Sequence, residues 1–564
     1  MKNRSLLVIV LICISCTKEK VITGKNGMVV STSAQASQVG IEILKQGGNA
    51  VDAAAAVGFT LAVTSSSNGN LGGGGFMVSR MANGKTFTLD YREMAPKSAY
   101  KDLFLDSSKN IIEGKSTATH YASGVPGSVD GLLRAWSDHG SGKISIKQLL
   151  GPAIDYAKNG FALTKYEAER FNSRKSFLSK HPETRRIFTR NDRKWKSGDV
   201  FYQKDLAATL ERIVENGRNG FYRGKTAQLI VAEMKNASNW MTLEDLENYT
   251  SKYRKPVVGE FNGLEIISMG PPSSGGILLV MMLNMFTSFG DMNNTNIFDL
   301  EFNSSEYIHL ITEIERRAYA DRATHLGDED FWQVPSEMLL SEIYAKERVQ
   351  NISIYKSTAS DDIKAGNSPF SESEETTHYS VIDKYGNAVS VTTTINSGYG
   401  SGITVTGAGF ILNNEMDDFS SKPGVPNMFG LIGNEANAIE AYKRPLSSMT
   451  PTLVIKDDKP FLILGTPGGS TIITTVLQNI LNVVVHKMNI KEAVDAPRFH
   501  SQWLPDQIDY EKNSLSKRTA NKLMLLGHKL DQRGYIGEAN GIMIDNGIYI
   551  GGADRRGENT AVGY

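Results

Sequence analysis

In this chain of 564 residues, the pattern of polar and apolar residues changes abruptly near residue 376. This change restricts how the surrounding sequence can fold. Residues 365–375 are small, polar and acidic without periodicity, which is typical of an exposed connection that tolerates cutting. Directly afterwards, two β-branched runs flank a Lys-Tyr-Gly-Asn turn at residues 384–387. The pattern predicts a β-hairpin whose first strand follows an exposed loop.

A hairpin symmetric about Tyr385 places Thr394 opposite Thr376, near enough for hydroxyl to meet hydroxyl. A threonine hydroxyl is a poor nucleophile without a base. If the bond between Glu375 and Thr376 is cut, the new α-amine has a pKa of about 7.7 to 8.0 and can accept that proton near neutral pH. The same hydroxyl can make the cut by attacking the preceding carbonyl. The arrangement suggests an N-terminal nucleophile, although by spacing alone a threonine-rich surface hairpin is the simpler interpretation.

A glycine turn later in the chain favours the nucleophile hypothesis. A short apolar strand at residues 461–464 leads into Gly-Thr-Pro-Gly-Gly-Ser, and a helix is predicted from about Thr471. Backbone N–H groups at such a helix N-terminus converge and favour negative charge. Gly468 and Gly469 are therefore candidates for an oxyanion hole. Phosphate binding is the alternative, but the loop contains no lysine.

Two polar segments lie between the hairpin and the glycine turn. Residues 413–419 are rich in asparagine and acids, and residues 443–452 combine an arginine with several hydroxyls. The acids are adjacent, whereas an EF-hand calcium loop spaces its ligands alternately. We therefore expect an acidic pocket for an ammonium group, complemented by hydroxyls and an arginine for a carboxylate.

The rest of the chain reads as a mixture of helices and short strands. Helices are predicted at residues 34–46 and 49–63, the second apolar nearly all round and therefore buried. The glycine run at residues 69–75 follows a helix and lacks a Walker lysine, so a tight backbone crossing is favoured over phosphate binding. Residues 130–350 are expected to be mostly amphipathic helix with solvated charged faces, most clearly at residues 307–322.

The composition excludes several classes of protein. The 61 basic and 61 acidic side chains balance, so nucleic acid is not an expected partner. The two cysteines, Cys13 and Cys16, lie within an N-terminal segment that has Lys2, Arg4 and a short apolar run. This segment reads as a secretory signal over residues 1–15, with Cys16 as a lipid attachment site of bacterial type and ordinary signal cleavage nearby as the alternative. No later window approaches the unbroken apolar stretch that a membrane-spanning helix requires.

Several motifs in one order resemble the γ-glutamyltransferase (γ-glutamyltranspeptidase) family of N-terminal nucleophile hydrolases. The resemblance extends from about residue 27 to Tyr564. The motifs are Gly-Gly-Asn-Ala-Val-Asp-Ala-Ala at 47–54, Gly-Asn-Leu-Gly-Gly-Gly-Gly-Phe-Met at 69–77, Arg-Glu-Met-Ala-Pro at 92–96, Thr-Thr-His-Tyr-Ser-Val at 376–381, Asn-Asn-Glu-Met-Asp-Asp-Phe at 413–419, Arg-Pro-Leu-Ser-Ser-Met at 444–449 and Pro-Gly-Gly-Ser at 467–470.

The resemblance implies a fold and a maturation step. The implied fold is of the α+β class, a four-layer αββα sandwich built jointly by two subunits. A precursor would cut itself into a large subunit, residues 16–375, and a small subunit, residues 376–564, which stay together as a heterodimer. The implied activity transfers the γ-glutamyl group of glutathione and related compounds to water or to amino acids and peptides. No cofactor and no metal are expected.

The resemblance also implies site residues. Thr376 corresponds to the nucleophile and Thr394 to its hydroxyl partner, while Gly468 and Gly469 match the oxyanion hole. Residues matching those that hold the α-carboxylate of the glutamyl group are Arg92, Ser447 and Ser448. Residues matching those around its α-amino end are Asn396, Glu415 and Asp418. Phe429 lies in a segment that resembles the family's lid loop, at a position that often holds tyrosine.

Other interpretations remain open at this point. A β-lactam side-chain acylase and a poly-γ-glutamate hydrolase are the enzymatic alternatives, and an inactive lipid-anchored γ-glutamyl binding protein is the non-enzymatic one. His378 and His500 are expected to be structural. Export implies a periplasmic or cell-envelope location in a bacterium, with membrane contact only through the lipid on Cys16.

Overall fold

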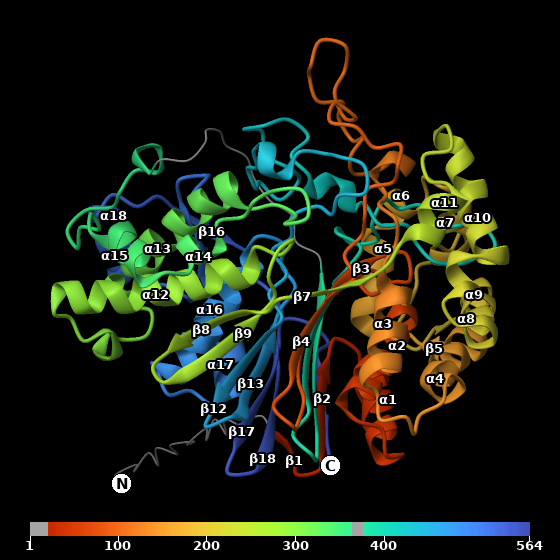
Figure 1. Ribbon diagram of the computed structural model, residues 1–564, viewed down its shortest axis with the longest axis horizontal. Helices are drawn as coiled ribbons and strands as arrows, with labels where there is room; N and C mark the ends of the chain where they lie inside the picture. Colours follow the sequence, from red (N-terminus) through yellow and green to blue (C-terminus); the bar gives the residue numbers. More distant parts are fainter. Residues whose placement is uncertain (1–20, 364–375) are drawn as a thin grey trace, which may run out of the picture.

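Two seven-stranded sheets lie face to face at the centre of the computed structural model, which describes residues 21–363 and 376–564 (Figure 1). The first sheet contains, in spatial order, β1 (Ile22–Gly24), β18 (Ile548–Ala553), β17 (Asn540–Asp545), β13 (Lys459–Gly465), β12 (Thr452–Lys456), β9 (Leu264–Ser268) and β8 (Val257–Phe261). The second contains β19 (Thr560–Gly563), β2 (Gly27–Ser31), β10 (Thr377–Asp383), β11 (Ala388–Thr394), β3 (Gly74–Arg80), β4 (Thr86–Asp90) and β7 (Lys252–Arg254). All pairs within these two sheets are antiparallel.

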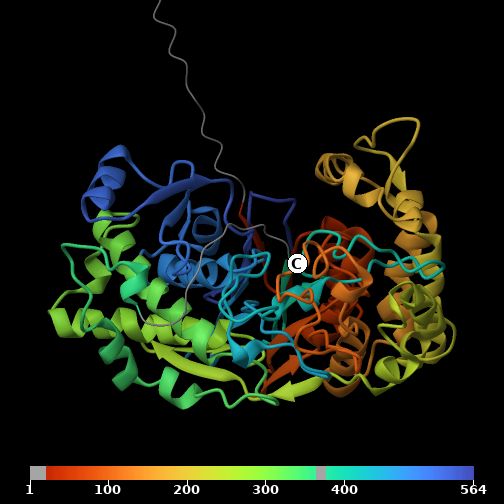
Figure 2. The ribbon, with the colours of Figure 1, turned by 90° about the horizontal axis from the view of Figure 1, so that it is seen from above.

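Helices cover the outer face of each sheet. On the second sheet these are α1 (Ala34–Lys45), α2 (Ala50–Thr64) and α3 (Ser128–His139), and on the first they are α12 (Gly275–Asn293), α16 (Thr471–Val484) and α17 (Ile490–Asp495). Figure 2 shows the layers from above, with the green helices on one side of the sheets and the red to yellow helices on the other. The predicted four-layer αββα sandwich is confirmed.

Further helices pack around these layers. Beside α2 and α3 lie α4 (Ile146–Asn159), α5 (Lys165–Ser173), α6 (Lys175–Leu178), α7 (Pro182–Phe188), α8 (Lys204–Asn216), α9 (Asn219–Tyr222), α10 (Gly224–Met234) and α11 (Leu243–Asn248). Beside α12 lie α13 (Ser305–His325), α14 (Ser336–Leu339), α15 (Glu342–Val349) and α18 (Lys517–Leu525). There are also two minor sheets, one of β5 (Phe161–Ala162) and β6 (Val200–Phe201) and one of β14 (Phe499–His500), β15 (Ile508–Glu511) and β16 (Leu530–Arg533), together with short 3-10 helices.

The core has one apolar layer between the sheets and one under the helices on each side. Strands β10 and β11 are buried on both faces, which explains why they contain so few exposed polar positions and so many β-branched residues. The layer between the sheets includes Met28, Val30, Phe76, Val78, Ile267, Leu453, Ile463 and Ile542.

The predicted N-terminal helices form as expected. Asn49 caps α2, accepting from the N–H groups of Val51 and Asp52, while the Asp52 carboxylate accepts from the N–H of Asn49 at 2.8 Å. This reciprocal pair is a capping box. Every residue of α2 is buried, as its apolar sequence predicted.

The prediction of solvated charged faces in residues 307–322 is wrong. In α13, Glu313 and Glu315 have no exposed surface, and Arg316 and Arg317 are 1% exposed. Arg317 donates to the Glu313 carboxylate at 2.8 Å, and the same carboxylate accepts from the N–H of Thr358 at 2.9 Å. Partners within the protein have replaced water, because a buried charge is tolerated only when it is paired. The strands β7, β8 and β9 also lie in the region expected to be mostly helical.

Among the described residues, α12 is the one helix long and apolar enough to cross a membrane by length and composition. Its apolar stretch is not unbroken, because Asn284 and Asp291 interrupt it. The helix packs against β8 and against α13, α15 and α16, and 78% of its apolar window is buried inside the protein. Its apolarity is therefore explained by its place in the core.

The hairpin has the predicted register. In the pairing of β10 with β11, Thr377 lies opposite Thr393 and His378 lies opposite Thr392. The next residues, at the end of the hairpin away from its turn, are Thr376 and Thr394. The glycine run at residues 69–75 makes the predicted close crossing beside this hairpin. A Cβ on Gly73 would lie 1.9 Å from the carbonyl oxygen of Thr394, and one on Gly72 would lie 2.0 Å from that of Ile411.

We expect Gly73→Ala to destabilise the protein by about 3 kcal/mol, because the added methyl group must push the backbone at Thr394 out of place. Gly534→Ala is the control, since nothing lies within 4 Å of a Cβ at that position. It should change the free energy of unfolding by no more than about 0.5 kcal/mol. Urea unfolding of both variants measures the difference. Equal stability of the two would contradict the close crossing.

Candidate active site

Most of the predicted site residues line one small cavity at the end of the two sheets where the loops joining β11 to β12 lie, drawn in cyan at the top of Figure 1. Thr376, 5% exposed, directly precedes β10, and its carbonyl oxygen accepts from Asn68 Nδ2 at 2.8 Å. Thr394 ends β11, and its hydroxyl accepts from the N–H of Asn396 at 2.7 Å. The cavity brings them together with Arg92, Glu415, Asp418, Phe429, Ser447, Ser448 and Gly469.

Arg92 lies at the centre of the charged side of the cavity. It lies two residues after the end of β4 and is 1% exposed. Its guanidinium forms ion pairs with Glu415 and Asp418, and its Nε donates to the carbonyl oxygen of Pro445 at 3.3 Å. The neighbouring Glu93 carboxylate lies 3.7 Å from the same guanidinium. The predicted arginine and acids therefore contact one another directly, whereas the sequence suggested two separate binding groups.

Burial has the largest influence on the pKa values of the acids in this cluster. It raises the pKa of Glu415 well above its usual range, raises the pKa of Glu93 to about 7, and raises the pKa of Asp418. Burial alone would lower the pKa of Arg92, but the adjacent Glu415 and Asp418 outweigh it, so the net shift is upward. The cluster therefore holds a permanent cation beside acids whose pKa values are raised by burial.

Arg322 is a member of the cavity that the sequence analysis missed. It lies on α13, where solvated charges were expected, and is 4% exposed. Its Nε donates to the Ser274 hydroxyl at 2.9 Å and its Nη2 to the Ser448 hydroxyl at 3.3 Å. Burial lowers its pKa to about 10, which still leaves it charged at neutral pH. A second guanidinium thus supports the predicted serine pair.

The glycine turn lies between β13 and α16, as predicted. Gly468 and Gly469 have φ values of +138° and +54°, which a side chain would strain. Among residues 21–363 and 376–564, no acceptor is recorded for the N–H of either glycine. Phe429 covers the turn, because a Cβ on Gly469 would lie 2.9 Å from its ring. Gly468 also lines a second cavity, which it shares with Thr376.

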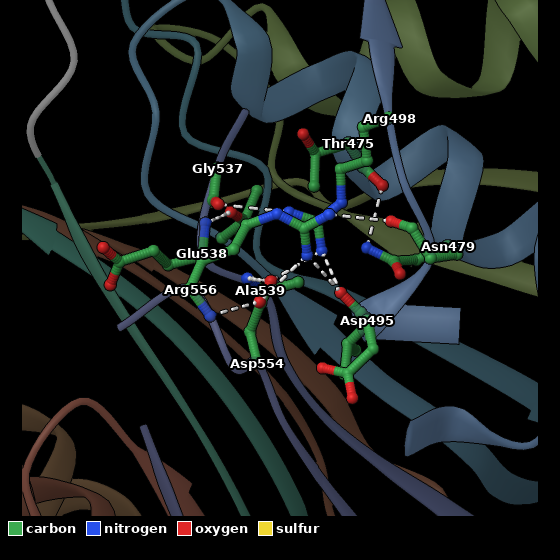
Figure 3. Close-up of polar contacts among 12 residues, drawn as sticks. Thr475, Asn479, Asp495, Arg498, Gly537, Glu538, Ala539, Asp554 and Arg556 are labelled. Carbon is green, nitrogen blue, oxygen red and sulfur yellow. Dashed lines mark hydrogen bonds and ion pairs between the residues drawn. The ribbon is translucent and has the colours of Figure 1, made fainter. Parts of the chain in front are cut away.

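A buried ion network holds the segment behind this turn (Figure 3). Arg498, 1% exposed, donates to the carbonyl oxygens of Ile536 at 2.6 Å and Gly537 at 3.1 Å, and to the Asp554 carboxylate at 2.6 Å. Arg556 donates to the other oxygen of Asp554 at 3.0 Å. A Cβ on Gly468 would lie 3.4 Å from Gly537, so the network fixes the wall behind the glycine turn.

The two histidines considered from the sequence lie in the core. His378 contacts the hydroxyls of Thr392 at 2.9 Å and Ser380 at 3.1 Å, and burial lowers its pKa to about 3. His500 contacts the Thr474 hydroxyl at 2.8 Å, and burial lowers its pKa to about 4. Both stay neutral at physiological pH and have structural partners, in agreement with the expectation.

One group of side chains within the described ranges has ligand atoms close enough for a metal, namely His309, Glu313 and His528. The two histidines share a hydrogen bond of 2.7 Å, and the other nitrogen of His309 lies 2.7 Å from the carbonyl oxygen of Ser353. Arg316 Nη2 lies 3.4 Å from the remaining nitrogen of His528, so all four ring nitrogens of this pair contact groups of the protein. The signal at residues 1–15, Cys16 and Glu375 lie outside the described residues.

The two facing sheets with helices on both sides have the architecture of N-terminal nucleophile hydrolases. The solved cephalosporin acylase from Bacillus halodurans shares this fold with a TM-score of 0.84 and 24% identity over 99% of each chain. The γ-glutamyltranspeptidase family model matches residues 36–564. The chain therefore belongs to the γ-glutamyltranspeptidase family, whose members are enzymes.

Two relatives are more similar in sequence. The glutathione hydrolase proenzyme of Escherichia coli (strain K12) is 44% identical over 546 residues, covering 96% of this chain and 93% of the relative. The crystal structure of Helicobacter pylori γ-glutamyltranspeptidase is 40% identical and has a TM-score of 0.57, covering 62% of this chain and 97% of that chain. Together they support a hydrolase or transferase activity for this chain.

We expect Arg498→Met to destabilise the protein by about 3 to 5 kcal/mol, because it leaves the buried Asp554 with one partner fewer and two carbonyl oxygens unpaired. The matched control is Arg555→Met, because Arg555 is exposed and directly follows Asp554 in the sequence. It should shift stability by no more than about 0.5 kcal/mol. Urea unfolding midpoints measure both, and similar midpoints would contradict the supporting role of the network.

Proposed function

We propose that this chain is a self-processing γ-glutamyltransferase and glutathione hydrolase. It would take the γ-glutamyl group from glutathione and similar donors and pass it to water or to the amine of an amino acid or peptide. The observation that carries the proposal is a single cavity in which Thr376 and Thr394 lie with a buried arginine, two acids and two serines. Such a set suits a free amino acid head group attached to a reacting carbonyl.

Maturation follows from the position of Thr376. Its hydroxyl oxygen attacks the carbonyl carbon of Glu375, and the C–N bond breaks as the C–O bond forms, which leaves an ester and a free α-amine. Water then adds to the ester carbonyl and releases the Glu375 carboxylate and the Thr376 hydroxyl. The E. coli relative is named a proenzyme, and the H. pylori chain matches 62% of this chain, close to the share of residues 16–375. Both facts support a precursor cut near Thr376.

The liberated amine then serves as the base for catalysis. It takes the hydroxyl proton of Thr376 as the oxygen attacks the γ-carbonyl carbon of the donor, and the Thr394 hydroxyl assists by hydrogen bonding. The N–H groups of Gly468 and Gly469 stabilise the negative oxygen of the tetrahedral intermediate. The proton passes to the leaving amine, and a γ-glutamyl-threonine ester remains. Water or an acceptor amine attacks this ester and restores the hydroxyl.

The charged side of the cavity explains the choice of a γ-linked donor. Arg92, with Ser447 and Ser448, binds the α-carboxylate, and Asn396, Glu415 and Asp418 surround the α-ammonium group. In the free protein Arg92 pairs with Glu415 and Asp418. A zwitterion can exchange these internal ion pairs for pairs with its own two charges, so no buried charge is left without a partner. An ordinary peptide bond would leave the head group without free ends.

Phe429 closes the cavity over the glycine turn with an aromatic ring that carries no hydroxyl. A cover of this kind excludes water from the reacting ester. The chemistry needs no cofactor, because the base, the nucleophile and the oxyanion donors all come from the chain. We further propose export to the periplasm or cell envelope, with a lipid on Cys16 as the anchor.

The acylase alternative differs in what the pocket must bind. A glutaryl side chain has a carboxylate but no ammonium group, so Glu415 and Asp418 would have no cationic end of the substrate to meet. The likeness to the Bacillus halodurans acylase, at 24% identity, concerns the fold alone. Glutaryl-amide hydrolysis faster than γ-glutamyl-amide hydrolysis would reverse the ranking.

We expect Thr376→Ala to remain a single uncut chain without hydrolase activity, because both maturation and catalysis need the hydroxyl. Thr377→Ala is the control, since its hydroxyl contacts Thr32 at 2.8 Å and takes no part in the proposed chemistry. It should still give two fragments on a denaturing gel. Mass spectrometry of the mature protein reads the new N-terminus at Thr376 and any lipid on Cys16. An uncut wild type that turned over γ-glutamyl anilide would refute the mechanism.

Donor binding should strengthen as pH rises through the neutral range. Burial raises the pKa of Glu415 and brings the pKa of Glu93 to about 7. A fraction of these two carboxyl groups is therefore protonated at low pH. The ammonium group favours the ionised carboxylate, so binding releases protons and KM falls with pH. We expect a fall of about threefold to tenfold between about pH 6 and 8.

Glu415→Gln should flatten this pH dependence and raise KM at the upper end. Asp417→Asn is the matched control, because Asp417 accepts from Ser116 and from the N–H of Met428 and forms no recorded ion pair with Arg92 in the described chain. It should keep the slope of wild type. An equally steep profile in Glu415→Gln would show that another group governs donor binding.

A further inference from the structure

A short loop between β11 and β12 covers the cavity of the proposed donor site, called the donor cavity below. This covering loop, residues 425–432, is closed by a bridge between Pro426 and Ile432. Its tip carries Met428 and Phe429, and the ring of Phe429 lies against the glycine turn. Phe429 is buried, whereas Met428 is half-buried, so solvent reaches part of the methionine side chain.

The sulfur of Met428 contacts two buried asparagine side chains. Asn396 Nδ2 lies 3.7 Å from this sulfur and Asn414 Nδ2 lies 3.8 Å from it, so the thioether accepts two weak hydrogen bonds. Asn396 lines the donor cavity, and its backbone N–H donates to the Thr394 hydroxyl at 2.7 Å. One sulfur atom therefore ties the covering loop to residues beside the reacting hydroxyls.

The two amides are held with their N–H groups toward the sulfur. Asn396 is 3% exposed and Asn414 has no exposed surface. The Asn414 Oδ1 accepts from the N–H of Ser397 at 3.1 Å, which directs its Nδ2 toward Met428. Asn396 Nδ2 also donates to the carbonyl oxygen of Asn414 at 2.9 Å. Within residues 21–363 and 376–564, the sulfur is the one recorded acceptor for Asn414 Nδ2.

The backbone of the loop tip has partners of its own. The N–H of Met428 donates to the Asp417 carboxylate at 2.9 Å, and the carbonyl oxygen of Phe429 accepts from Gln502 Nε2 at 3.4 Å. These contacts do not involve the sulfur, so the loop keeps its fold when the sulfur contacts are lost. The sulfur contacts therefore govern how closely the loop lies over the donor cavity.

We propose that Met428 is an oxidation site, with hydrogen peroxide or another hydroperoxide as the oxidant, and that its oxidation lifts the covering loop from the donor cavity. The sulfur attacks one peroxide oxygen, and the O–O bond breaks as the S–O bond forms. The proton of the transferred oxygen passes to the leaving oxygen, which departs as water or an alcohol. The thioether is oxidised by two electrons to a sulfoxide and the peroxide is reduced. The inference rests on the proposed function for the identity of the substrate.

Two features make this methionine the sensitive group. Residues 17–564 contain no cysteine, so the body of the protein has no thiol to react with the oxidant first. The side chain is also half-buried, which leaves the thioether within reach of a small peroxide. Other methionines are more exposed, but they lie outside the covering loop, as Met524 does at 53% exposure.

The sulfoxide does not fit the present geometry. Its oxygen is a stronger acceptor than the thioether, and the buried amide of Asn414 favours such a partner. The two amide nitrogens already contact the sulfur, so an oxygen between them would lie far closer than the usual N–H···O distance of about 2.9 Å. Because the asparagines are buried and bonded to their neighbours, the loop must move outward. This movement takes the ring of Phe429 off the glycine turn and weakens donor binding.

The test measures binding and loop exposure before and after treatment of the mature protein with hydrogen peroxide. We expect peptide mass spectrometry to find a sulfoxide at Met428, and the KM for γ-glutamyl-p-nitroanilide to rise about threefold to tenfold. Deuterium exchange in residues 425–432 should become faster. Methionine sulfoxide reductases should reverse both changes, because they restore the thioether.

Three variants separate the sulfur from the rest of the chain. Met428→Leu conserves volume without a sulfur, so its KM should not respond to peroxide. Met428→Gln carries an amide oxygen on a side chain of similar length, so it should have the KM of oxidised wild type without treatment. Met524→Leu is the matched control, because Met524 is an exposed methionine outside the covering loop. It should keep the full response of wild type.

An unmodified Met428 in protein whose Met524 is fully oxidised would overturn the inference, as would an equal rise of KM in wild type and Met428→Leu. The exchange measurement separates this inference from the proposed function. A protein that turns over no γ-glutamyl compound, but whose covering loop exchanges faster once Met428 is oxidised, would refute the proposed function alone. An active enzyme with oxidised Met428 and unchanged KM and exchange would refute the oxidation site alone.

Discussion

Pairing between strands from both sides of residue 376 holds this molecule together. In the second sheet, β10 pairs with β2 and β11 pairs with β3, so each hairpin strand is bonded to a strand from the first part of the chain. In the first sheet, β12 pairs with β9 in the same way. These ladders are buried on both faces and cannot exchange their hydrogen bonds for water. A cut just before Thr376 breaks none of them, so two chains can remain one folded body.

In both buried ion networks, charged side chains are paired with opposite charges within the protein. Arg92 with Glu415 and Asp418 faces the donor cavity, while Arg498 with Asp554 and Arg556 lies behind the glycine turn. Replacing a buried ion pair with apolar groups often costs nothing, so such pairs are weak evidence for stability. In this protein the two networks hold neighbouring groups in position. The first network keeps a cation and two acids together at the cavity that Thr376 lines, and the second keeps a glycine loop in one place.

Local patterns were predictable, and patterns that depend on distant neighbours were not. The hairpin register follows from its own turn, and the cap of α2 follows from Asn49 and Asp52, so both agree with the structure. The charges of α13 look solvated in sequence, but their partners, such as Thr358, come from elsewhere in the chain. Arg322 was missed for this reason. Its neighbours Ile308, Ile311 and Ile314 spread apolar surface around the helix, and that was the available signal.

The edge strand β19 has a consequence for the order of events during synthesis. Residues 560–563 pair with β2, and the carbonyl oxygen of Tyr564 accepts from the N–H groups of Lys25 at 2.8 Å and Asn26 at 2.7 Å. Strand β2 is also the neighbour of β10. The sheet around Thr376 is thus incomplete until the ribosome has added residues far beyond the hairpin. The native surroundings of Thr376 are therefore complete only after residues 560–563 have been synthesised and have paired with β2.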